Sequence, residues 1–392
     1  MDITIYPKKL TGTVQAIPSK SQAHRALICA ALSDNSTSMI CQDTNKDIEA
    51  TVSCLNAIGA NICRTSDGYH IVPIKEPVMS AQLDCGESGS TLRFMLPIVG
   101  ALGIDATIIM HGRLPNRPLS PLWEEMERMG CSLSRPTAST IHCTGRLKSG
   151  TYTIDGGVSS QYITGLLLAQ PLIGPDTAVE VVGTLQSESY VKLTKQVIAL
   201  YKSENATIPY HSPGHISIEG DWSNGAFFVA AKKLGNAVEI SGLLTSSVQG
   251  DRVCVELTEK LSNNITIDAA DIPDLVPILA VTAAANQGAV FTNIARLRLK
   301  ESDRVQTVIS LLEALGAKAE ANENTLTVHP APFRGCEIDS HNDHRIAMSA
   351  AIAATCASGP VKIKNAQCVE KSYPLFWDVY KQLGGHYEQH VR

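Results

Sequence analysis

The chain has 392 residues, of which 44% are hydrophobic and 5% aromatic, and its formal net charge is -5 at pH 7. This length exceeds what one hydrophobic core usually organises, so we expect two lobes, each with a core of its own. The negative charge and the low aromatic content argue against a nucleic-acid-binding protein, which needs a basic face or stacking platforms. Any anion site must therefore be local.

The N-terminal residues, the apolar runs and the cysteines indicate the cellular compartment of the protein. Residues 1–7 lack the basic and then apolar layout of a signal peptide, and no apolar run approaches the ~18 residues that a membrane span needs. We therefore expect a cytoplasmic protein with no membrane or nucleic-acid partner. The 11 cysteines include no Cys-x-x-Cys pair, and several, such as Cys29 and Cys356, lie inside apolar runs. Reduced core thiols are the expected state, rather than disulfides or metal ligands.

The first chemical signal is a pair of cations and a pair of hydroxyls directly before an apolar run at residues 26–32. Ser19 and Ser21 are good helix N-caps, so we expect a buried helix that begins at about Ser21. Lys20 and Arg25 then lie at the positive end of its dipole, which disfavours cations, and the pattern indicates an anion site. A solvated charge pair is the plainer alternative. The motif is not a Walker A loop, which requires Gly where Ser19 stands.

Two kinds of helix alternate along the chain. The first kind is apolar on nearly every side and opens near Ser, Asn or Asp; we expect it at residues 21–32, 88–102, 159–172, 223–234, 272–286 and 342–357. The second kind is amphipathic and stops at a Gly or Asn suited to a left-handed conformation. We expect it at residues 48–58, 122–129, 191–201 with its stop at Asn205, 253–261, 305–315 and 375–383.

Strand-like alternation lies between these helices, for example at residues 3–5, 151–154 and 215–218. Each unit is therefore expected to contain strands and two helices, and six such units divide into three and three near residues 209–220. Two similar lobes with a cleft between them follow from this division. A repeat scaffold without chemistry is the alternative, and the position of the charged residues distinguishes the two.

Polar clusters occur at the starts of the buried helices. The second helix opens with Gly-Glu-Ser-Gly-Ser-Thr-Leu-Arg at residues 86–93, where glycine N–H groups can approach an oxyanion closely. The third opens with three hydrogen-bonding side chains, where one cap would suffice. These are Ser159, Ser160 and Gln161.

The last two buried helices continue the pattern. Residues 341–345 place Arg345 at the start of the sixth helix, and Asp271 and Asp274 flank Pro273 at the start of the fifth. Carboxylates suit a helix N-terminus, so simple capping explains either Asp equally well.

Residues 296–304, Arg-Leu-Arg-Leu-Lys-Glu-Ser-Asp-Arg, concentrate charge between these two helices. Their alternation predicts a strand with its cations on one face, namely Arg296, Arg298 and Lys300. Ser302 or Asp303 can then cap the next helix, and Glu301 is free for another role. A salt-bridged surface turn is the plainer interpretation.

Six motifs occur in order between about residues 3 and 375. They are Pro-Ser-Lys-Ser-x-x-x-Arg at 18–25, Gly-x-Ser-Gly-Ser-Thr-x-Arg at 86–93, Asn-Arg-Pro at 116–118, Ser-Ser-Gln at 159–161, Leu-Lys-Glu-Ser-Asp-Arg at 299–304 and Asn-Asp-His-Arg at 342–345. None is decisive alone, but together they closely resemble the 5-enolpyruvylshikimate-3-phosphate synthase family.

The resemblance implies a two-lobed, inside-out α/β barrel, the enolpyruvyl transferase fold, in which each lobe has three βαβαββ units with buried helices. Residues 1–14 with 221–392 would form one lobe and residues 15–220 the other, with the active site in the cleft between them. The implied reaction transfers the enolpyruvyl group of phosphoenolpyruvate to the 5-hydroxyl of shikimate 3-phosphate and releases phosphate, in the shikimate pathway. The two substrates are the expected partners of a monomer, and neither a metal nor another cofactor is implied.

The resemblance also assigns residues to each substrate. The shikimate 3-phosphate side comprises Lys20, Ser21, Arg25, Ser159, Ser160, Gln161, Ser187, Tyr190, Asp274 and Lys300. The phosphoenolpyruvate side comprises Lys20, Gly89, Arg117, Gln161, Arg304, Arg345 and Lys371. Asp274 is the expected base, and Glu301 and Lys20 are the expected proton donors and acceptors for the two half-reactions. Glu87 and Arg296 stand where family members use Asn, so neither receives a role.

Three alternatives stay open. The UDP-N-acetylglucosamine enolpyruvyl transferase family shares the fold but has a Cys in the loop corresponding to residues 110–117, where this chain has none. A phosphotransferase is disfavoured because the P-loop and a Mg²⁺-ligand pattern are missing. A non-enzymatic repeat scaffold requires that the cations at the helix starts do not converge.

Overall fold

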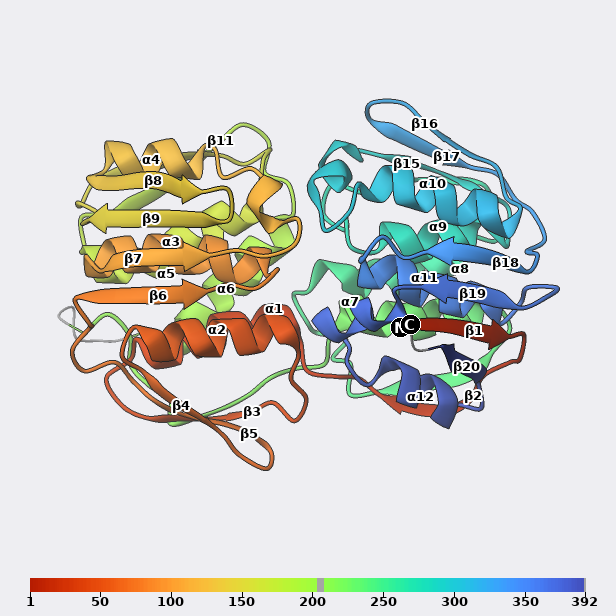
Figure 1. The fold of residues 1–392 in the computed structure, drawn as a ribbon, viewed down its shortest axis with the longest axis horizontal. Helices are drawn as coiled ribbons and strands as arrows, with labels where there is room; N and C mark the ends of the chain where they lie inside the picture. Colours follow the sequence, from red (N-terminus) through yellow and green to blue (C-terminus); the bar gives the residue numbers. More distant parts are fainter. Residues whose placement is uncertain (203–207, 391–392) are drawn as a thin grey trace. The chain divides into compact units, whose positions relative to one another are not determined.

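A computed structural model describes residues 1–202 and 208–390 (Figure 1). The chain divides into two compact units: unit 1 comprises Met1–Ile17 with Gly220–Arg392, and unit 2 comprises Pro18–Glu219. No helix among the described residues is both long and apolar enough to cross a bilayer.

Unit 2 contains helices that alternate with short strands. Its helices are α1 (Lys20–Ala31), α2 (Lys46–Ala57), α3 (Gly89–Leu102), α4 (Leu122–Arg128), α5 (Ser160–Ile173), α6 (Glu188–Leu200) and the 3₁₀ turn η1 (Leu114–Asn116). Its strands are β3 (Thr37–Ile40), β4 (Asn61–Arg64), β5 (Gly68–Val72), β6 (Ser80–Asp84), β7 (Asp105–Ile109), β8 (Cys131–Thr137), β9 (Thr140–Gly145), β10 (Thr151–Asp155), β11 (Ala178–Val182) and β12 (His215–Ser217).

Unit 1 repeats this alternation. Its helices are α7 (Trp222–Lys233), α8 (Cys254–Lys260), α9 (Val276–Ala284), α10 (Arg304–Leu315), α11 (His344–Ala354), α12 (Phe376–Gln382) and the 3₁₀ segments η2 (Gly250–Val253), η3 (Ala295–Leu299) and η4 (Ala366–Lys371). Its strands are β1 (Asp2–Tyr6), β2 (Thr11–Gln15), β13 (Ala237–Ser241), β14 (Ile265–Asp268), β15 (Ala289–Thr292), β16 (Ala319–Ala321), β17 (Thr325–Val328), β18 (Cys336–Asp339), β19 (Val361–Lys364) and β20 (His386–His390).

One sheet pattern recurs in both units. The strand orders are β12-β3-β5-β4 and β6-β7-β9-β8 in unit 2, and β14-β15-β17-β16 and β18-β19-β1-β20 in unit 1. In each sheet the first two strands are parallel and the other neighbours antiparallel. Within the described residues, the sheets β10-β11 and β13-β2 have only their parallel pair. Only residues 261–264 separate α8 from β14, which leaves no room for a hairpin in that repeat.

Two strands are exchanged between the halves of the chain. Strand β2 directly precedes α1 in sequence, yet it pairs with β13 of unit 1. Strand β12 precedes α7, yet it pairs with β3 of unit 2. Strand β1 completes the last sheet of unit 1 by lying between β19 and β20. The N-terminal residues therefore belong to the same unit as the C-terminal half.

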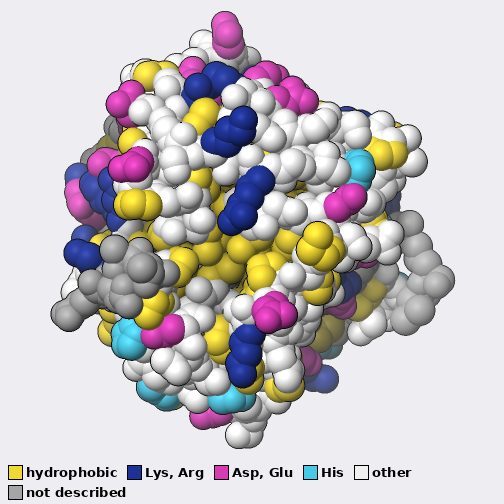
Figure 2. All heavy atoms as spheres, turned by 90° about the vertical axis from the view of Figure 1, so that its left-hand side faces the viewer, with side chains coloured by type: hydrophobic (Ala, Val, Ile, Leu, Met, Phe, Trp, Pro, Cys, Tyr) yellow, Lys and Arg dark blue, Asp and Glu magenta, His cyan; other side chains and the backbone are white. Residues whose placement is uncertain are grey.

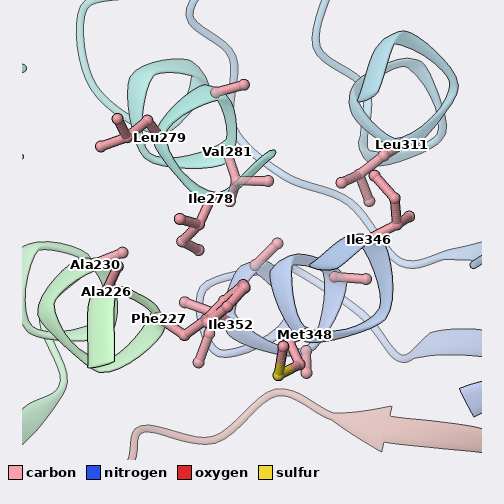
Figure 3. Close-up of a cluster of buried hydrophobic side chains, with 14 of the residues drawn as sticks. Ala226, Phe227, Ala230, Ile278, Leu279, Val281, Leu311, Ile346, Met348 and Ile352 are labelled. Atoms are coloured by element: carbon pink, nitrogen blue, oxygen red, sulfur yellow. The ribbon is translucent and has the colours of Figure 1, made fainter. Parts of the chain in front are cut away.

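The apolar helices lie in the core, as their sequences predict. Every residue of α9 and α11 is buried, and α1 and α3 are buried along most of their length. In unit 1, Phe227 of α7, Ile278 of α9 and Ile352 of α11 pack among one another (Figure 3). Side chains of this size contribute about 1.5–3 kcal/mol each when fully buried. Because these helices fill the interior, their N-terminal turns bring polar residues to fixed positions.

Several helix boundaries differ from the sequence prediction. Helix α1 begins at Lys20, because the Ser19 side chain accepts the N–H of Gln22 and acts as the cap. Helix α11 begins only at His344, since His341 and Asn342 have positive φ angles of 51° and 57° and Asp343 is the N-cap. Helix α9 spans fewer residues than the expected 272–286. The helix stop expected at Asn205 lies outside the described residues.

Charge is scattered on the face of unit 2 that Figure 2 shows. Lys and Arg side chains there are interrupted by uncharged surface, acidic side chains lie beside them, and apolar surface fills the middle of the view. This face therefore carries no continuous basic area.

Candidate active site

Unit 2 carries ten of the predicted site residues at or near the starts of α1, α3, α5 and α6 and directly after η1, and we call this set the Arg25 cluster. Its members are Lys20, Ser21, Arg25, Gly89, Arg117, Ser159, Ser160, Gln161, Ser187 and Tyr190. Unit 1 gathers a second set at the starts of α9, α10 and α11, which we call the Arg304 cluster. Its members are Ser223, Asp274, Lys300, Glu301, Arg304, Asp343, Arg345 and Lys371.

Arg25 is the buried centre of the first cluster, with 3% of its surface exposed. Its Nε donates to Thr194 Oγ1 at 2.7 Å, and its Nη2 donates to Thr164 Oγ1 at 3.2 Å and to the Tyr190 carbonyl at 3.3 Å. The Ser21 carbonyl accepts from Nη1 at 2.6 Å. Every one of these acceptors is neutral, and in the described part of the chain no carboxylate pairs with Arg25. Burial lowers the pKa of Arg25 to about 10, so it stays charged at neutral pH.

Lys20 is held by a carboxylate at the start of the neighbouring helix. Its Nζ lies 2.9 Å from Oδ2 of Asp47, and about a sixth of each side chain is exposed, 18% and 17% respectively. The Asp47 carbonyl accepts from Thr91 of α3, which in turn bonds Thr51 of α2. Lys20 is therefore fixed relative to α1, α2 and α3, yet remains within reach of solvent.

Gly89 lies directly against two guanidinium groups. A Cβ added to Gly89 would lie 2.7 Å from Nη1 of Arg117 and 2.8 Å from Nη1 of Arg93. Arg93 is buried and donates to the carbonyls of Gly89 and Pro118. The glycine therefore lets Arg117 approach the first turn of α3, where backbone N–H groups are available to an anion.

The three hydrogen-bonding residues at the start of α5 divide their roles. Ser159 is the N-cap and accepts the N–H of Gln161, while the Gln161 amide reaches Ser90 of α3 at 3.0 Å. Ser187 precedes α6 in a left-handed conformation, with φ of 55°. Such a conformation costs a non-glycine residue of order 1 kcal/mol and is often found at functional sites.

Arg304 is the buried centre of the second cluster and bonds three carboxylates. Its Nη1 lies 2.5 Å from Asp274, its Nη2 2.5 Å from Glu301 and its Nε 2.9 Å from Asp343. Burial alone would lower the pKa of Arg304, but these carboxylates raise it well above its usual value. Asp343 also caps α11 by accepting the N–H of Arg345, so one guanidinium joins the starts of three helices.

Asp274 lies between several cations, with its side chain 20% exposed. Arg345 donates to its Oδ2 at 3.3 Å and to Ser223 at 2.7 Å, and the ammonium of Lys300 lies 3.6 Å from its Oδ1. Burial alone would raise the pKa of Asp274, but the surrounding cations outweigh burial and hold it well below its usual range. The same carboxylate does not cap α9, so capping does not explain its position.

Two lysines complete the second cluster. Burial lowers the pKa of Lys300 to about 8, although Asp274 acts in the opposite direction. Lys371, at the end of η4, is 9% exposed and donates to the carbonyl of Asn342 at 2.9 Å. Asn342 is one of the two left-handed residues before α11, so this contact fixes that turn.

One prediction about this region is wrong. Residues 295–299 form the 3₁₀ segment η3, not a strand, so Arg296, Arg298 and Lys300 do not share a strand face. Lys300 is instead drawn toward Asp274, while Arg298 bonds the carbonyl of Asn322. The prediction that Asp303 can cap the following helix is confirmed, because its side chain accepts the N–H of Gln306.

Glu87 lies close to the loop that leads to Arg117. A Cβ added to Gly112 would lie 2.5 Å from the Glu87 carboxyl carbon, so glycine is needed there for steric reasons as well as for its φ of +55°. The departure from the family pattern at Glu87 is therefore accommodated by Gly112.

Sequence reasoning missed the partners of the cations. Asp47 lies one residue before the amphipathic helix predicted at residues 48–58, and Thr164 and Thr194 look like ordinary helix residues. Asp343 lies within a quoted motif but received no role. Short polar residues in or beside the helices were the only signal available, and that signal is too common to be used alone.

In unit 1 the cations Lys300, Arg304 and Arg345 converge on Asp274, so the condition for a repeat scaffold without chemistry is not met there. Buried guanidinium groups beside helix N-termini suit phosphate and carboxylate ligands. The carboxylates next to them can move protons. Among the described residues, no group of three or more His, Cys, Asp or Glu side chains could hold a metal ion.

Comparison with known sequences supports a chemical interpretation. The family model for "EPSP synthase (3-phosphoshikimate 1-carboxyvinyltransferase)" matches residues 5–380. A 3-phosphoshikimate 1-carboxyvinyltransferase of Clostridium kluyveri is 34% identical, with 99% of this chain and 98% of the relative covered. One of Clostridium perfringens is 36% identical, with 98% of each chain covered.

Comparison with solved structures supports the fold. EPSP synthase of Acinetobacter baumannii superposes with a TM-score of 0.77 at 22% identity, covering 99% of this chain and all of that one. The enolpyruvyl transferase NikO of Streptomyces tendae gives a TM-score of 0.74 at 16% identity, covering 100% and 99%. At these identities the likeness concerns the fold alone.

Proposed function

The chain belongs to the EPSP synthase family, and from this premise we propose how its residues divide the two substrates and the proton transfers. The enzyme transfers the enolpyruvyl group of phosphoenolpyruvate to the 5-hydroxyl of shikimate 3-phosphate and releases phosphate, as a step of the shikimate pathway to aromatic amino acids. Both substrates are polyanions at neutral pH. A chain with net charge -5 must therefore bind them through local groups of cations rather than through its overall field.

The observation that carries the assignment is the environment of Arg25. A buried cation that has only neutral partners is costly to fold, because desolvation is not offset by an ion pair. An anionic ligand offsets that cost, so we assign the phosphate of shikimate 3-phosphate to Arg25. The hydroxyls and amide at the start of α5 supply uncharged hydrogen bonds for the same substrate. We assign the following further residues to shikimate 3-phosphate: Lys20, Ser21, Ser159, Ser160, Gln161, Ser187, Tyr190, Asp274 and Lys300.

Phosphoenolpyruvate carries a phosphate and a carboxylate, and cations of both clusters are assigned to it. Arg117 lies against Gly89 at the start of α3, where the helix N-terminus adds its own attraction for an anion. Arg304, Arg345 and Lys371 are the cations assigned from unit 1. Bidentate guanidinium contacts fit both anionic groups of the substrate. Lys20 and Gln161 are shared between the two substrates.

The addition and the elimination each require proton transfers. The 5-hydroxyl loses its proton as its oxygen bonds C2 of phosphoenolpyruvate, while C3 gains a proton; phosphate then leaves C2 as the new methyl group loses a proton. We assign Asp274 as the base for the hydroxyl, and Glu301 and Lys20 as the groups that exchange protons with the carbon and the leaving oxygens.

In the substrate-free protein, the ion pairs of the Arg304 cluster make Asp274 and Glu301 poor proton acceptors. Asp274 is ionised but is a weak base while its neighbouring cations hold its pKa low, and Glu301 is paired with Arg304. An incoming phosphate or carboxylate competes for the same guanidinium groups. We propose that this competition weakens the internal ion pairs and raises the basicity of both carboxylates at the moment when the substrate is in place.

Two further properties are proposed. We propose that the active form is a monomer. The 11 cysteines lie within the described residues and are free thiols, most of them buried, which supports a reducing compartment such as the cytoplasm.

An assay of phosphate release tests the proposed function. We expect release only when phosphoenolpyruvate and shikimate 3-phosphate are present together, and none when UDP-N-acetylglucosamine replaces shikimate 3-phosphate. Release with the UDP-sugar, or with phosphoenolpyruvate alone, would contradict the substrate assignment. Enolpyruvylshikimate 3-phosphate identified by mass spectrometry distinguishes transfer from simple hydrolysis.

A further inference from the structure

Asp251 is a buried carboxylate that the proposed reaction does not use. It lies in η2, between α7 and α8, and is 3% exposed. Its Oδ1 atom is buried and has no hydrogen-bond partner among the described residues. Buried carboxylates are rarely left incompletely paired, so this arrangement requires an explanation.

Asp251 adjoins the Arg304 cluster at Ser223, a member of that cluster. Ser223, near the start of α7, is close enough to Asp251 for its hydroxyl to lower the pKa of that carboxylate. The same hydroxyl accepts from Nη2 of Arg345 at 2.7 Å, and this nitrogen also lies 3.3 Å from Oδ2 of Asp274. Asp251 therefore orients the hydroxyl that fixes Arg345 beside Asp274.

The charged groups that act on Asp251 come from three neighbouring elements, and a thiol lies on a fourth. Asp221 at the cap of α7 and Asp274 before α9 are negative, Arg345 of α11 is positive, and Cys254 follows on α8. Burial, followed by repulsion from Asp274, raises the pKa of Asp251 to about 7. The pKa of Asp274 is shifted in the opposite direction. Neighbouring carboxylates whose pKa values are shifted in opposite directions commonly differ in protonation at neutral pH.

We propose that Asp251 is a positioning residue for the transfer reaction: it holds Arg345 beside Asp274 through Ser223, and it takes up one proton from solvent when an anionic substrate binds Arg345. The proposal rests on the proposed function, which assigns Arg345 to phosphoenolpyruvate. A bound anion adds negative charge where Arg345 now offsets the charge of Asp251. The neutral carboxylic acid is then the stable form, and it still accepts the Ser223 hydroxyl through its carbonyl oxygen.

The sign of the pH effect follows directly. Below about pH 7 Asp251 is already protonated, and substrate binding needs no additional proton. Above that pH the carboxylate is ionised in the free enzyme, so kcat/KM for phosphoenolpyruvate falls by up to about tenfold for each further pH unit. Asp251→Asn imitates the neutral form at every pH.

The experiment compares pH profiles of kcat/KM for phosphoenolpyruvate at saturating shikimate 3-phosphate. We expect Asp251→Asn to equal wild type within about threefold at pH 6 and to exceed it by about fivefold or more at pH 8.5. Ionisation of the substrates is common to both proteins and cancels in their ratio. Asp251→Ala removes the acceptor for Ser223, and we expect an about tenfold loss at pH 6, which Asn rescues.

A matched control is Asp2→Asn, which changes another buried carboxylate of unit 1 that accepts a backbone N–H. The pH profile of kcat/KM for phosphoenolpyruvate in Asp2→Asn should be parallel to that of wild type. Should Asp251→Asn fail to fold by circular dichroism, Ser223→Ala provides the second test. Loss of the Ser223 hydrogen bond, which favours the ionised form of Asp251, should move the fall in kcat/KM to higher pH.

Parallel profiles for wild type and Asp251→Asn, or an unshifted fall in Ser223→Ala, would overturn the proposal. Arg345→Lys separates this failure from a failure of the proposed function. If that variant retains wild-type kcat/KM for phosphoenolpyruvate, the assignment of Arg345 is wrong. If it loses kcat/KM while the Asp251 profiles stay parallel, only the role of Asp251 is wrong.

Discussion

Lys20 combines a fixed position with access to solvent, which is what proton transfer to a bound substrate needs. Its ammonium is 2.9 Å from Asp47 and its side chain is 18% exposed, so it contributes little to core packing. We expect Lys20→Met to lower kcat/KM by about 100-fold or more while the circular dichroism spectrum stays unchanged. A variant that keeps more than about a tenth of wild-type kcat/KM, a loss below about 1.4 kcal/mol, would refute the role of Lys20.

Lys300 gives the site an alkaline limit. Because burial lowers its pKa to about 8, its positive charge is present below that pH and is lost as the pH rises through it. We expect kcat/KM for shikimate 3-phosphate to fall above about pH 8 in wild type, since an assigned cation becomes neutral. In Lys300→Arg the guanidinium stays charged, and the fall should move to higher pH. An identical alkaline limb in both proteins would show that another group is responsible.

At the scale of elements, the first turn of α3 is shaped by the absence of a side chain at Gly89. In Gly89→Ala the new methyl group would meet Nη1 of Arg117 at 2.7 Å and Nη1 of Arg93 at 2.8 Å. These are ends of flexible side chains, so we expect the fold to survive and Arg117 to be displaced. KM for phosphoenolpyruvate should rise by about tenfold, with a smaller change in kcat.

Gly359→Ala is a suitable control for this substitution, because its new Cβ would find its nearest neighbour at an ordinary contact distance of 3.4 Å. Its kinetic constants should equal those of wild type. An unchanged KM for phosphoenolpyruvate in Gly89→Ala would mean that Arg117 is not held by this contact.

The elements were largely predictable because two hydrophobic patterns alternate along the chain. An all-round apolar pattern marks α9 and α11, and a one-sided pattern marks α2 and α10. The segment that was predicted wrongly, residues 296–300, has the alternation of a strand, but its conformation is set by contacts far along the chain. Lys300 approaches Asp274, and no local pattern encodes that contact.

The candidate site was predictable only in part. Cations at the helix starts are visible in sequence because Lys20, Arg25 and Arg345 are unusual beside apolar runs. The carboxylates that hold them are not visible, since Asp47 and Asp251 occupy unremarkable polar positions whose burial and neighbours exist only after folding. The family resemblance predicted the roles of these cations, whereas the carboxylates that bond them became visible only in the structure.

At the scale of the whole molecule, the repeats account for the position of both clusters. Each unit is assembled from similar parallel strand pairs, and the exchange of β2 and β12 means that both units depend on strands from distant parts of the sequence. In unit 1, Arg304 bonds Asp274 before α9 and Asp343 at the cap of α11, and in unit 2 Arg25 of α1 bonds Thr164 of α5. The molecule therefore concentrates positive charge locally although its net charge is negative.

This arrangement predicts that substrate binding and stability of the free protein oppose each other at Arg25. Replacing Arg25 by Met removes a buried cation, and the partners left behind can bond one another. Thr194 already donates to the Tyr190 carbonyl at 2.8 Å and lies 2.9 Å from Thr164. Met also packs well beside Phe94, which the guanidinium now covers. We expect the substrate-free variant to unfold at a temperature equal to or above that of wild type.

Calorimetric titration of Arg25→Met with shikimate 3-phosphate, accompanied by thermal unfolding of the same samples, tests the central claim that this buried cation is present to bind the substrate. We predict that affinity for shikimate 3-phosphate falls by about 100-fold or more, while the substrate-free protein keeps its unfolding temperature. Binding within about threefold of wild type, together with a lower unfolding temperature, would instead show that Arg25 serves the fold and would contradict the account.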